Sequence, residues 1–163
     1  AAPSYEECVL AFKRQVGRRV LENFGMDPRL GKYHQSCCGQ CEMIFSASPI
    51  QPTCPSCGCT KLVKGVADRI EEIADATEGL HPATRPPYIY QAPLYMLPGL
   101  GGKTLAKLVD ELGTEMELIH AVSLTEIQRV GGRRVAAAMA AVRNGTATVQ
   151  SGGGGIYGKV GLP

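Results

Sequence analysis

Two Cys-x-x-Cys pairs constrain this chain more than any other feature of its sequence. The pairs are Cys38 with Cys41 and, after twelve intervening residues, Cys54 with Cys57. Each pair can bring two thiolates to one ion while the amides of its turn donate to the sulfurs, and two such turns supply the four ligands of a tetrahedral zinc. The sequence therefore predicts one structural zinc ion. Four sulfur ligands leave no open position, so this metal is not expected to be catalytic.

Other interpretations of the cysteines stay open. An iron centre of the rubredoxin type uses the same ligands, the sulfurs could instead form disulfides, and the spacing could be coincidental. The absence of an export signal disfavours disulfides. Three of the seven cysteines remain. We interpret Cys8 as a small buried apolar residue, whereas Cys37 and Cys59 flank the pairs and could compete as ligands.

Composition excludes several classes of protein. The longest uninterrupted apolar run, 135–142, has eight residues, whereas a helix needs about 20 to cross a bilayer. We therefore expect a cytoplasmic protein without a membrane partner. Hydrophobic residues make up 44% of the 163 residues, enough for a core, and with 6% aromatics that core must be largely aliphatic. The formal charge is only +2, and four thiolates with one Zn²⁺ would lower it to about zero.

Local patterns predict a mixed α+β fold. Ser4 and Glu7 form a capping box that begins a helix carrying Val9, Leu10 and Val16, which Gly17 weakens or ends. The segment 18–24 could be helix or strand. We then expect a strand at 62–66 and a helix from Val66, with Ile70 and Ile73, that stops near Gly79. An extended proline-rich segment should follow at 81–93. The remaining expected elements are helices at 103–112 and 115–122, a short helix opened by Ser123 with Glu126, and a helix at 133–143 ended by Asn144-Gly145.

These elements suggest a small four-cysteine module of the zinc-ribbon type, followed by an α-helical domain of the helix-hairpin-helix type. The expected parts are a helix and linker at 1–32, a zinc-binding module with a trailing helix at 33–80, the helical domain at 81–145 and a glycine-rich tail at 146–163.

The segment that follows Leu97 is the strongest candidate for binding DNA. Its sequence Gly102-Lys103-Thr104 suggests a phosphate-binding Walker motif, but that motif needs glycine at position 97. A helix-hairpin-helix fits better, because its glycines let the backbone approach a DNA phosphate at the start of the next helix. The predicted contact residues of this first hairpin are Gly99, Gly101, Gly102, Lys103 and Thr104. Such contacts ignore base identity and are sensitive to salt.

A second, shorter hairpin is predicted at Gly131, Gly132, Arg133 and Arg134, although it lacks the Pro-Gly pair of the first. For both hairpins an ordinary helix–helix turn stays an alternative, with Leu100 packed inward in the first. The three histidines are too scattered to suggest a catalytic base, and no pair of carboxylates stands out. On these residues the chain alone is not expected to be an enzyme.

Several phrases together resemble the endonuclease Q group of PHP-domain nucleases. They are Gly25–His34 (GMDPRLGKYH), the two cysteine pairs, Lys64-Gly65-Val66 with Asp68-Arg69-Ile70, His81-Pro82 with Arg85-Pro86-Pro87-Tyr88 and Pro93-Leu94, Gly113 with Glu115, and Gly155-Ile156-Tyr157-Gly158-Lys159. The resemblance covers nearly the whole chain. It departs from the family at Gly152–Gly155, where an aromatic and an acidic residue are expected, and in hairpin glycines closer to a standard DNA-binding hairpin.

The resemblance implies a role in DNA repair. Members of this family recognise deaminated bases or abasic sites and cut the backbone on the 5′ side, using metals held by an N-terminal PHP domain. The histidine and aspartate motifs of that domain have no counterpart here, so the chain resembles the C-terminal half, with 1–32 leading out of the PHP domain. The alternative is a protein-interaction or DNA-binding module attached to a helicase, ligase or polymerase. NAD-dependent DNA ligases also place a four-cysteine zinc site before hairpins. A complete small nuclease is disfavoured.

Overall fold

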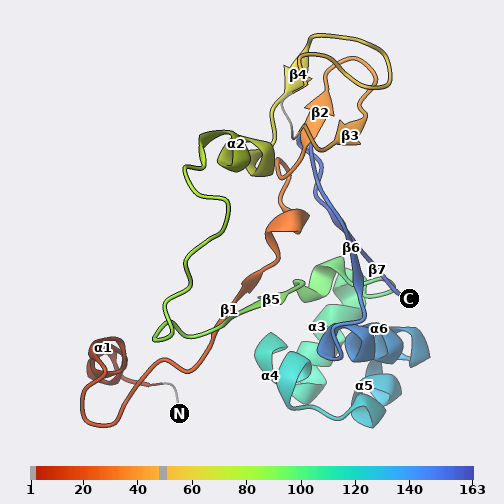
Figure 1. Cartoon of the computed structure of the whole chain (residues 1–163). Helices are drawn as coiled ribbons and strands as arrows, with labels where there is room; N and C mark the ends of the chain where they lie inside the picture. The colour runs from red at the N-terminus through yellow and green to blue at the C-terminus, as the bar shows by residue number, and fades with distance from the viewer. Residues whose placement is uncertain (1–2, 48–50) are drawn as a thin grey trace. The chain divides into compact units, whose positions relative to one another are not determined.

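The computed structural model describes residues 3–47 and 51–163 and confirms a mixed α+β fold (Figure 1). In chain order the elements are α1 (Tyr5–Lys13), β1 (Asn23–Met26), the 3-10 helix η1 (Pro28–Leu30), β2 (Ser36–Cys38), β3 (Ile44–Phe45), β4 (Leu62–Val63), α2 (Val66–Ile73), β5 (Tyr88–Gln91), the 3-10 helix η2 (Leu94–Met96), α3 (Gly102–Leu112), α4 (Glu115–His120), α5 (Leu124–Gly131), α6 (Arg133–Arg143), β6 (Thr148–Gln150) and β7 (Lys159–Gly161). The chain divides into two compact units, Ala1–Gly25 with Ala76–Gln91, and Met26–Asp75 with Ala92–Pro163.

The first unit contains α1 and the pairing of β1 with β5. The predicted capping box is confirmed: the amide of Glu7 donates to Oγ of Ser4 at 3.2 Å, and the amide of Ser4 donates back to the Glu7 carboxylate at 2.8 Å. The helix ends earlier than expected, because Arg14 adopts a left-handed conformation with φ of 54°. Val16 therefore lies outside the helix. Segment 18–24, left open by the sequence, ends in a strand that begins at Asn23.

The second unit contains a three-stranded antiparallel sheet in the order β3-β2-β4. Cys37 pairs with Ile44 on one side and with Val63 on the other. Helix α2 follows, and it ends at Ile73 rather than near Gly79. Its apolar row, Val66, Ile70 and Ile73, is between 55% and 60% exposed, so the periodic pattern found in the sequence does not correspond to a buried face in this chain.

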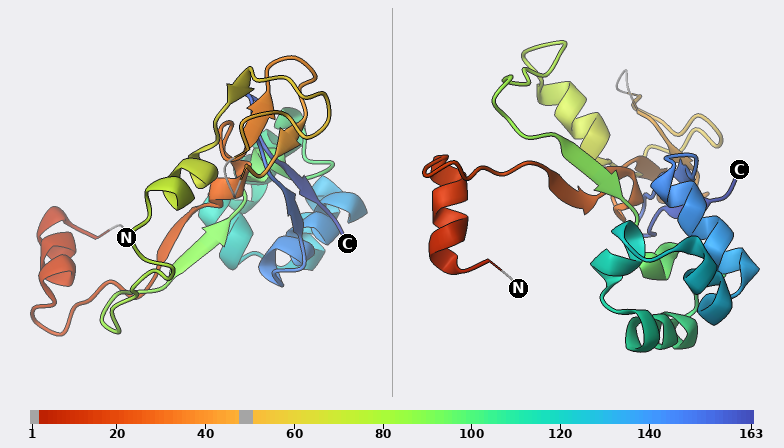
Figure 2. Two further views of the ribbon diagram at one scale, coloured as in Figure 1. Left: turned by 45° about the horizontal axis from the view of Figure 1, so that its top comes forward. Right: turned by 90° about the horizontal axis from the view of Figure 1, so that it is seen from below.

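Helices α3 to α6, which lie together in Figure 2, contribute most of the larger hydrophobic core of the second unit. Its fully buried side chains are aliphatic, as the composition predicted, and they include Leu94, Leu108, Leu118, Ile127 and Met139. Leu100, in the first predicted hairpin, is only 4% exposed and belongs to this core. A second, smaller cluster forms around Cys38, Phe45, Ala47 and Cys54. Among the described residues, no helix is long and apolar enough to span a bilayer.

The glycine-rich tail at 146–163 contains the antiparallel strands β6 and β7, and the residues between these strands lie against the segment that precedes β2. The amide of Gly152 donates to the carbonyl of Arg29 at 2.8 Å, and the amide of Gln35 donates to the carbonyl of Gly152 at 2.9 Å. Gly154 has φ of 60°, and a Cβ atom there would lie 2.5 Å from Sγ of Cys37. Gly152, Gly153 and Gly154 are thus explained by close contacts that leave no room for a side chain, and Gly155 is explained by its φ of 93°.

Candidate metal centre and nucleic-acid interface

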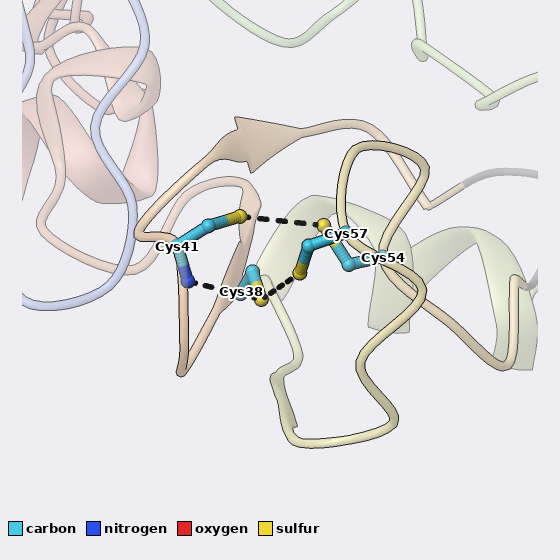
Figure 3. A group of neighbouring side chains, drawn as sticks. All are labelled: Cys38, Cys41, Cys54 and Cys57. Atoms are coloured by element: carbon cyan, nitrogen blue, oxygen red, sulfur yellow. Dashed lines mark hydrogen bonds between the residues drawn. The ribbon is translucent and has the colours of Figure 1, made fainter.

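Four cysteine sulfurs converge on one point of the second unit. The sulfur atoms of Cys38, Cys41, Cys54 and Cys57 all lie within 4.8 Å of one another (Figure 3). Cys38 and Cys57 are 3.5 Å apart at Sγ, and Cys41 and Cys54 are 3.6 Å apart. Sulfurs around a tetrahedral zinc lie roughly 3.8 Å apart, given Zn–S bonds of about 2.3 Å. The four cysteines can therefore hold a metal ion, and their spacing fits a tetrahedral one.

Each pair is held by its own turn. The amide of Gln40 donates to Sγ of Cys38, and the amide of Ser56 donates to Sγ of Cys54, both at 3.4 Å. Backbone bonds close the two loops, from the amide of Cys38 to the carbonyl of Met43 at 2.9 Å and from the amide of Cys54 to the carbonyl of Cys59 at 2.8 Å. The two turns thus present their sulfurs in the same way.

The pKa values of the cysteine thiols differ, because their surroundings favour the thiolate at Cys38 and the neutral thiol at Cys57. Backbone amides of Cys41 and Gln40 lower the pKa of Cys38 to about 6. The amide of Cys59 lowers the pKa of Cys57, but desolvation and the three neighbouring thiols outweigh it and raise that pKa to about 12. Desolvation and hydrogen bonds among the thiols thus oppose full ionisation of the cluster. A divalent cation among the sulfurs favours the thiolate forms, which is what a thiolate metal site requires.

The other three cysteines lie outside this cluster. Sγ of Cys37 donates to the carbonyl of Cys38 at 3.6 Å and packs against Gly154, and burial raises its pKa. Sγ of Cys59 accepts from the amide of Lys61 at 3.3 Å. Within the part of the chain that the structure describes, neither joins the four converging sulfurs. Cys8 lies on α1 and is half-buried rather than buried.

A buried carboxylate to which the sequence assigned no structural role holds together the segments around the four cysteines. Asp68 is 6% exposed and accepts from the backbone amides of Ser36 at 3.1 Å and Ala47 at 3.0 Å. Hydroxyls of Ser36 and Ser46 also donate to it, at 2.5 and 3.3 Å. It thereby joins α2 to β2 and to the segment after β3. The signals available in the sequence were its place beside the apolar row of a short helix and in the Asp68-Arg69-Ile70 phrase of the resemblance.

The first predicted hairpin is a tight turn that leads directly into α3. The amide of Leu100 donates to the carbonyl of Leu97 at 3.1 Å, and Gly99 takes φ of 85°. Gly101 is the N-cap and makes no side-chain hydrogen bond, and both Gly101 and Gly102 face open space. Lys103 is exposed and Thr104 is half-buried. The element before the turn is the three-residue η2 rather than an α-helix.

The second predicted hairpin joins α5 to α6 through one residue. Gly132 takes φ of 87° and faces open space, and Arg133 and Arg134 are exposed at the start of α6. Gly131 instead faces the core, because a Cβ atom there would lie 3.1 Å from the side chain of Val135 and 3.4 Å from that of Leu108. Gly131 is therefore placed for helix packing.

The structure brings the two predicted hairpin turns together, which the sequence did not predict. A Cβ atom on Gly99 would lie 2.9 Å from Cδ of Arg134, so the first turn lies against the first turn of α6. Helices α3 and α6 have glycine at the N-cap, Gly101 and Gly132, so no side chain caps their N-termini, and the same is true of α2. By contrast, Ser4, Thr114 and Ser123 cap α1, α4 and α5. Since a helix N-terminus attracts anions, two adjacent uncapped N-termini with basic residues suit phosphate groups.

No protein-family model matches the chain. The uncharacterised protein YqxK of Bacillus subtilis is 40% identical over 157 residues, which cover 96% of this chain and 39% of YqxK. The uncharacterised protein MJ0043 of Methanocaldococcus jannaschii is 32% identical over 170 residues, which cover 96% of this chain and 21% of that protein.

Two solved structures match nearly the whole chain. The crystal structure of the lesion-specific endonuclease PfuEndoQ of Pyrococcus furiosus aligns with a TM-score of 0.76 and 35% identity, over 99% of this chain and 43% of that one. The structure of endonuclease Q in complex with a 27-mer duplex substrate, with an abasic lesion at the active site, aligns with a TM-score of 0.72 and 35% identity. The alignment covers 100% of this chain and 44% of that chain. This chain spans less than half the length of these relatives, and over that span it is similar to part of endonuclease Q.

Proposed function

We propose that this chain is the zinc-binding and DNA-binding part of a DNA-repair endonuclease of the endonuclease Q type. The observation that carries the proposal is the likeness of the whole chain to an endonuclease Q that is bound to a duplex with an abasic lesion. The catalytic metals would belong to a PHP domain elsewhere in the parent protein, and this chain would hold the duplex while that domain cuts 5′ of a deaminated base or abasic site.

In this proposal the metal is zinc and its role is structural. Four cysteine sulfurs at tetrahedral spacing, with amides donating to them, are the donor set that zinc prefers. The sheet around them is short, since β3 and β4 have two residues each, and the local core contains few side chains. Metal ligation therefore supplies folding free energy that so small a module lacks.

The DNA contact proposed is to the sugar-phosphate backbone. In the first hairpin, no hydrogen-bond partner for the amides of Gly102, Lys103 and Thr104 exists among the described residues, so these amides can donate to a phosphate. The Lys103 ammonium and the Thr104 hydroxyl add charge and a further donor. In the second hairpin, Arg133 and Arg134 supply two guanidinium groups beside Gly132. Adjacent hairpins would hold neighbouring phosphates without reading bases.

An alternative function, docking onto another protein, is favoured by α2. Its three apolar side chains Val66, Ile70 and Ile73 are more than half exposed on one helix, whereas single exposed apolar residues need no explanation. The occupant could be the PHP domain of the parent or a separate helicase, ligase or polymerase. DNA affinity of the isolated chain separates the two functions, because a docking module would bind duplex only together with its partner.

The direct test compares two lysines on α3. Lys103 lies in the first turn, whereas Lys107 lies one turn later, with its ammonium 3.8 Å from the Glu111 carboxylate. Duplex affinity is measured by fluorescence anisotropy at several salt concentrations. Lys103→Gln should weaken binding several-fold and reduce the salt slope by about 1. Lys107→Gln is the matched control and should change affinity less than twofold. Equal effects of the two variants would contradict phosphate binding at the start of α3.

A further inference from the structure

The four cysteines of the candidate metal centre are unequally protected from solvent. Cys38 and Cys54, the first cysteine of each pair, are 1% and 2% exposed and belong to the small buried cluster with Phe45. Cys41 and Cys57, the second cysteine of each pair, are exposed. A dissolved reagent therefore reaches one cysteine in each turn far more easily than the other.

Each exposed sulfur lies beside a buried sulfur of the opposite turn. Sγ of Cys57 is 3.5 Å from Sγ of Cys38, and Sγ of Cys41 is 3.6 Å from Sγ of Cys54 (Figure 3). A disulfide bond is about 2 Å long, so closing either contact needs a shift of about 1.5 Å. Such a shift is small for turns joined by strands of two residues, β3 and β4.

The neighbouring cysteines are poorly placed to take part. Cys37 is 7% exposed, and its thiol donates to the carbonyl of Cys38. Sγ of Cys59 accepts from the amide of Lys61 and is not among the converging sulfurs of the described residues. A bound divalent metal, by contrast, keeps the four converging sulfurs as thiolates, which is the form that oxidants attack.

We infer that this centre is also a site of reversible oxidation by hydrogen peroxide, which joins the two turns by a disulfide and releases the metal. The inference rests on the proposed zinc-binding role of the chain and adds a redox control of it. The bond assigned is Cys38–Cys57, the closer of the two contacts, with Cys57 as the cysteine that reacts first.

The chemistry balances with one molecule of peroxide. The Cys57 thiolate attacks a peroxide oxygen, so that an S–O bond forms, the O–O bond breaks, and the departing hydroxide takes a proton to become water. The Cys38 thiolate then attacks the sulfur of Cys57, so that the S–S bond forms, the S–O bond breaks, and a second hydroxide is protonated to water. Two sulfurs thus lose two electrons, and the peroxide gains them.

Oxidation would therefore act on the fold of the segments around the cysteines. Two of the four metal ligands are consumed, and a metal ion held by the remaining two sulfurs is readily lost. The aliphatic core of α3 to α6 contains none of these cysteines and should stay folded. A dithiol that reduces the disulfide should let the metal bind again.

The test treats the wild-type chain, loaded with one zinc ion, with hydrogen peroxide beside a chromogenic chelator. One zinc should be released for each disulfide formed, and mass spectrometry of the alkylated, digested protein should find Cys38 linked to Cys57. Dithiothreitol with added zinc should restore the NMR resonances of residues ~33–66. Cys37→Ser and Cys59→Ser are the matched controls, and each should release zinc at a rate within about twofold of wild type.

Each other result would count against the inference. Zinc that stays bound in peroxide, or leaves only when sulfinic or sulfonic acids form, would overturn it. A disulfide within one turn, such as Cys54–Cys57, would overturn the assigned bond, and slow release from Cys59→Ser would make Cys59 the second reacting thiol instead of Cys38. A chain that takes up no zinc before oxidation would contradict the proposed zinc-binding role as well, whereas zinc retention in peroxide leaves that role intact.

Discussion

The side chain of Arg134 lies against the backbone of Gly99, so closely that a Cβ atom at position 99 would be 2.9 Å from Cδ and 3.0 Å from Cγ of the arginine. Gly99 belongs to the turn before α3, and Arg134 is in the first turn of α6. This contact joins two segments that both begin a helix with basic residues. Glycine is required at position 99 on two grounds, because its φ of 85° also disfavours any side chain.

The first prediction concerns Gly99→Ala. Alanine at this φ costs about 1 to 2 kcal/mol of stability, and its methyl group must displace Arg134. We expect the free energy of unfolding to fall by about that amount, with a loss of duplex affinity because the two hairpins move apart. Urea unfolding and fluorescence anisotropy measure the two effects. An unchanged unfolding midpoint would show that the turn relaxes without strain.

The second prediction is that Gly102→Ala separates stability from binding. Gly102 is helical, and a Cβ atom there meets nothing within 4 Å. Alanine should therefore raise stability by about 0.5 to 1 kcal/mol, because glycine is a poor helix former. The same methyl group would lie where a phosphate approaches the free amides, so duplex affinity should fall. Higher stability with undiminished affinity would place the DNA elsewhere on the chain.

The third prediction tests the carboxylate that holds the metal module. Asp68→Ala leaves the amides of Ser36 and Ala47 without their acceptor, and a loss of about 3 kcal/mol or more is expected. In the metal-bound variant, hydrogen exchange at these two amides should be faster than in the metal-bound wild type. Asp75→Ala, at an exposed position beyond the end of α2, is the matched control and should change stability by less than about 0.5 kcal/mol. Equal exchange rates in the two variants would contradict the role given to Asp68.

The fourth prediction concerns pH and the cap of α4. The backbone amide of Thr114 donates to the Glu117 carboxylate at 2.7 Å and its hydroxyl at 2.9 Å, and these bonds hold the pKa of Glu117 below its ordinary value of 4.5. A lowered pKa in the folded state means that the ionised carboxylate stabilises the fold above about pH 4.5, and that this contribution is lost as pH falls through the folded pKa.

Carbon-13 NMR of the Glu117 carboxyl group measures that pKa directly. A Thr114→Ala variant removes the hydroxyl donor but keeps the amide, so the pKa should rise only part of the way towards 4.5. A wild-type value at or above 4.5 would show that the carboxylate does not cap α4 in solution.

Features set by neighbouring residues were predictable from sequence. The cap at Ser4, the bounds of α6 and the two cysteine turns each depend on a few consecutive residues, and the structure shows each of them. Thr114 with Glu117 is an equally local capping box, which was readable in the sequence and was missed.

Features that join distant segments were not predictable. Asp68 takes its donors from positions 21 to 32 residues away, and no periodicity indicates such partners. Three of the glycines after Ser151, Gly152 to Gly154, are explained by the backbone of 29–35 and the sulfur of Cys37 that they approach. Apolar spacing in α2 correctly indicated a helix, but spacing cannot say whether the partner of an apolar face lies within the same chain.

The last prediction is that metal removal unfolds the segments around the four cysteines and spares the helical core of α3 to α6. The sulfurs of Cys38 and Cys54 belong to the small cluster, whereas the core of α3 to α6 is a separate group of aliphatic side chains. A strong chelator should therefore erase the NMR dispersion of residues ~33–66 and leave the resonances of Leu108 and Met139 in place.

Cys57→Ser should reduce metal stoichiometry below one per chain under competition with a chelator. Cys59→Ser, at a sulfur outside the cluster, should keep one tightly bound metal. Unfolding of the whole chain on metal loss would show that the two cores depend on each other, and an unchanged spectrum would show that the cysteines need no metal to fold.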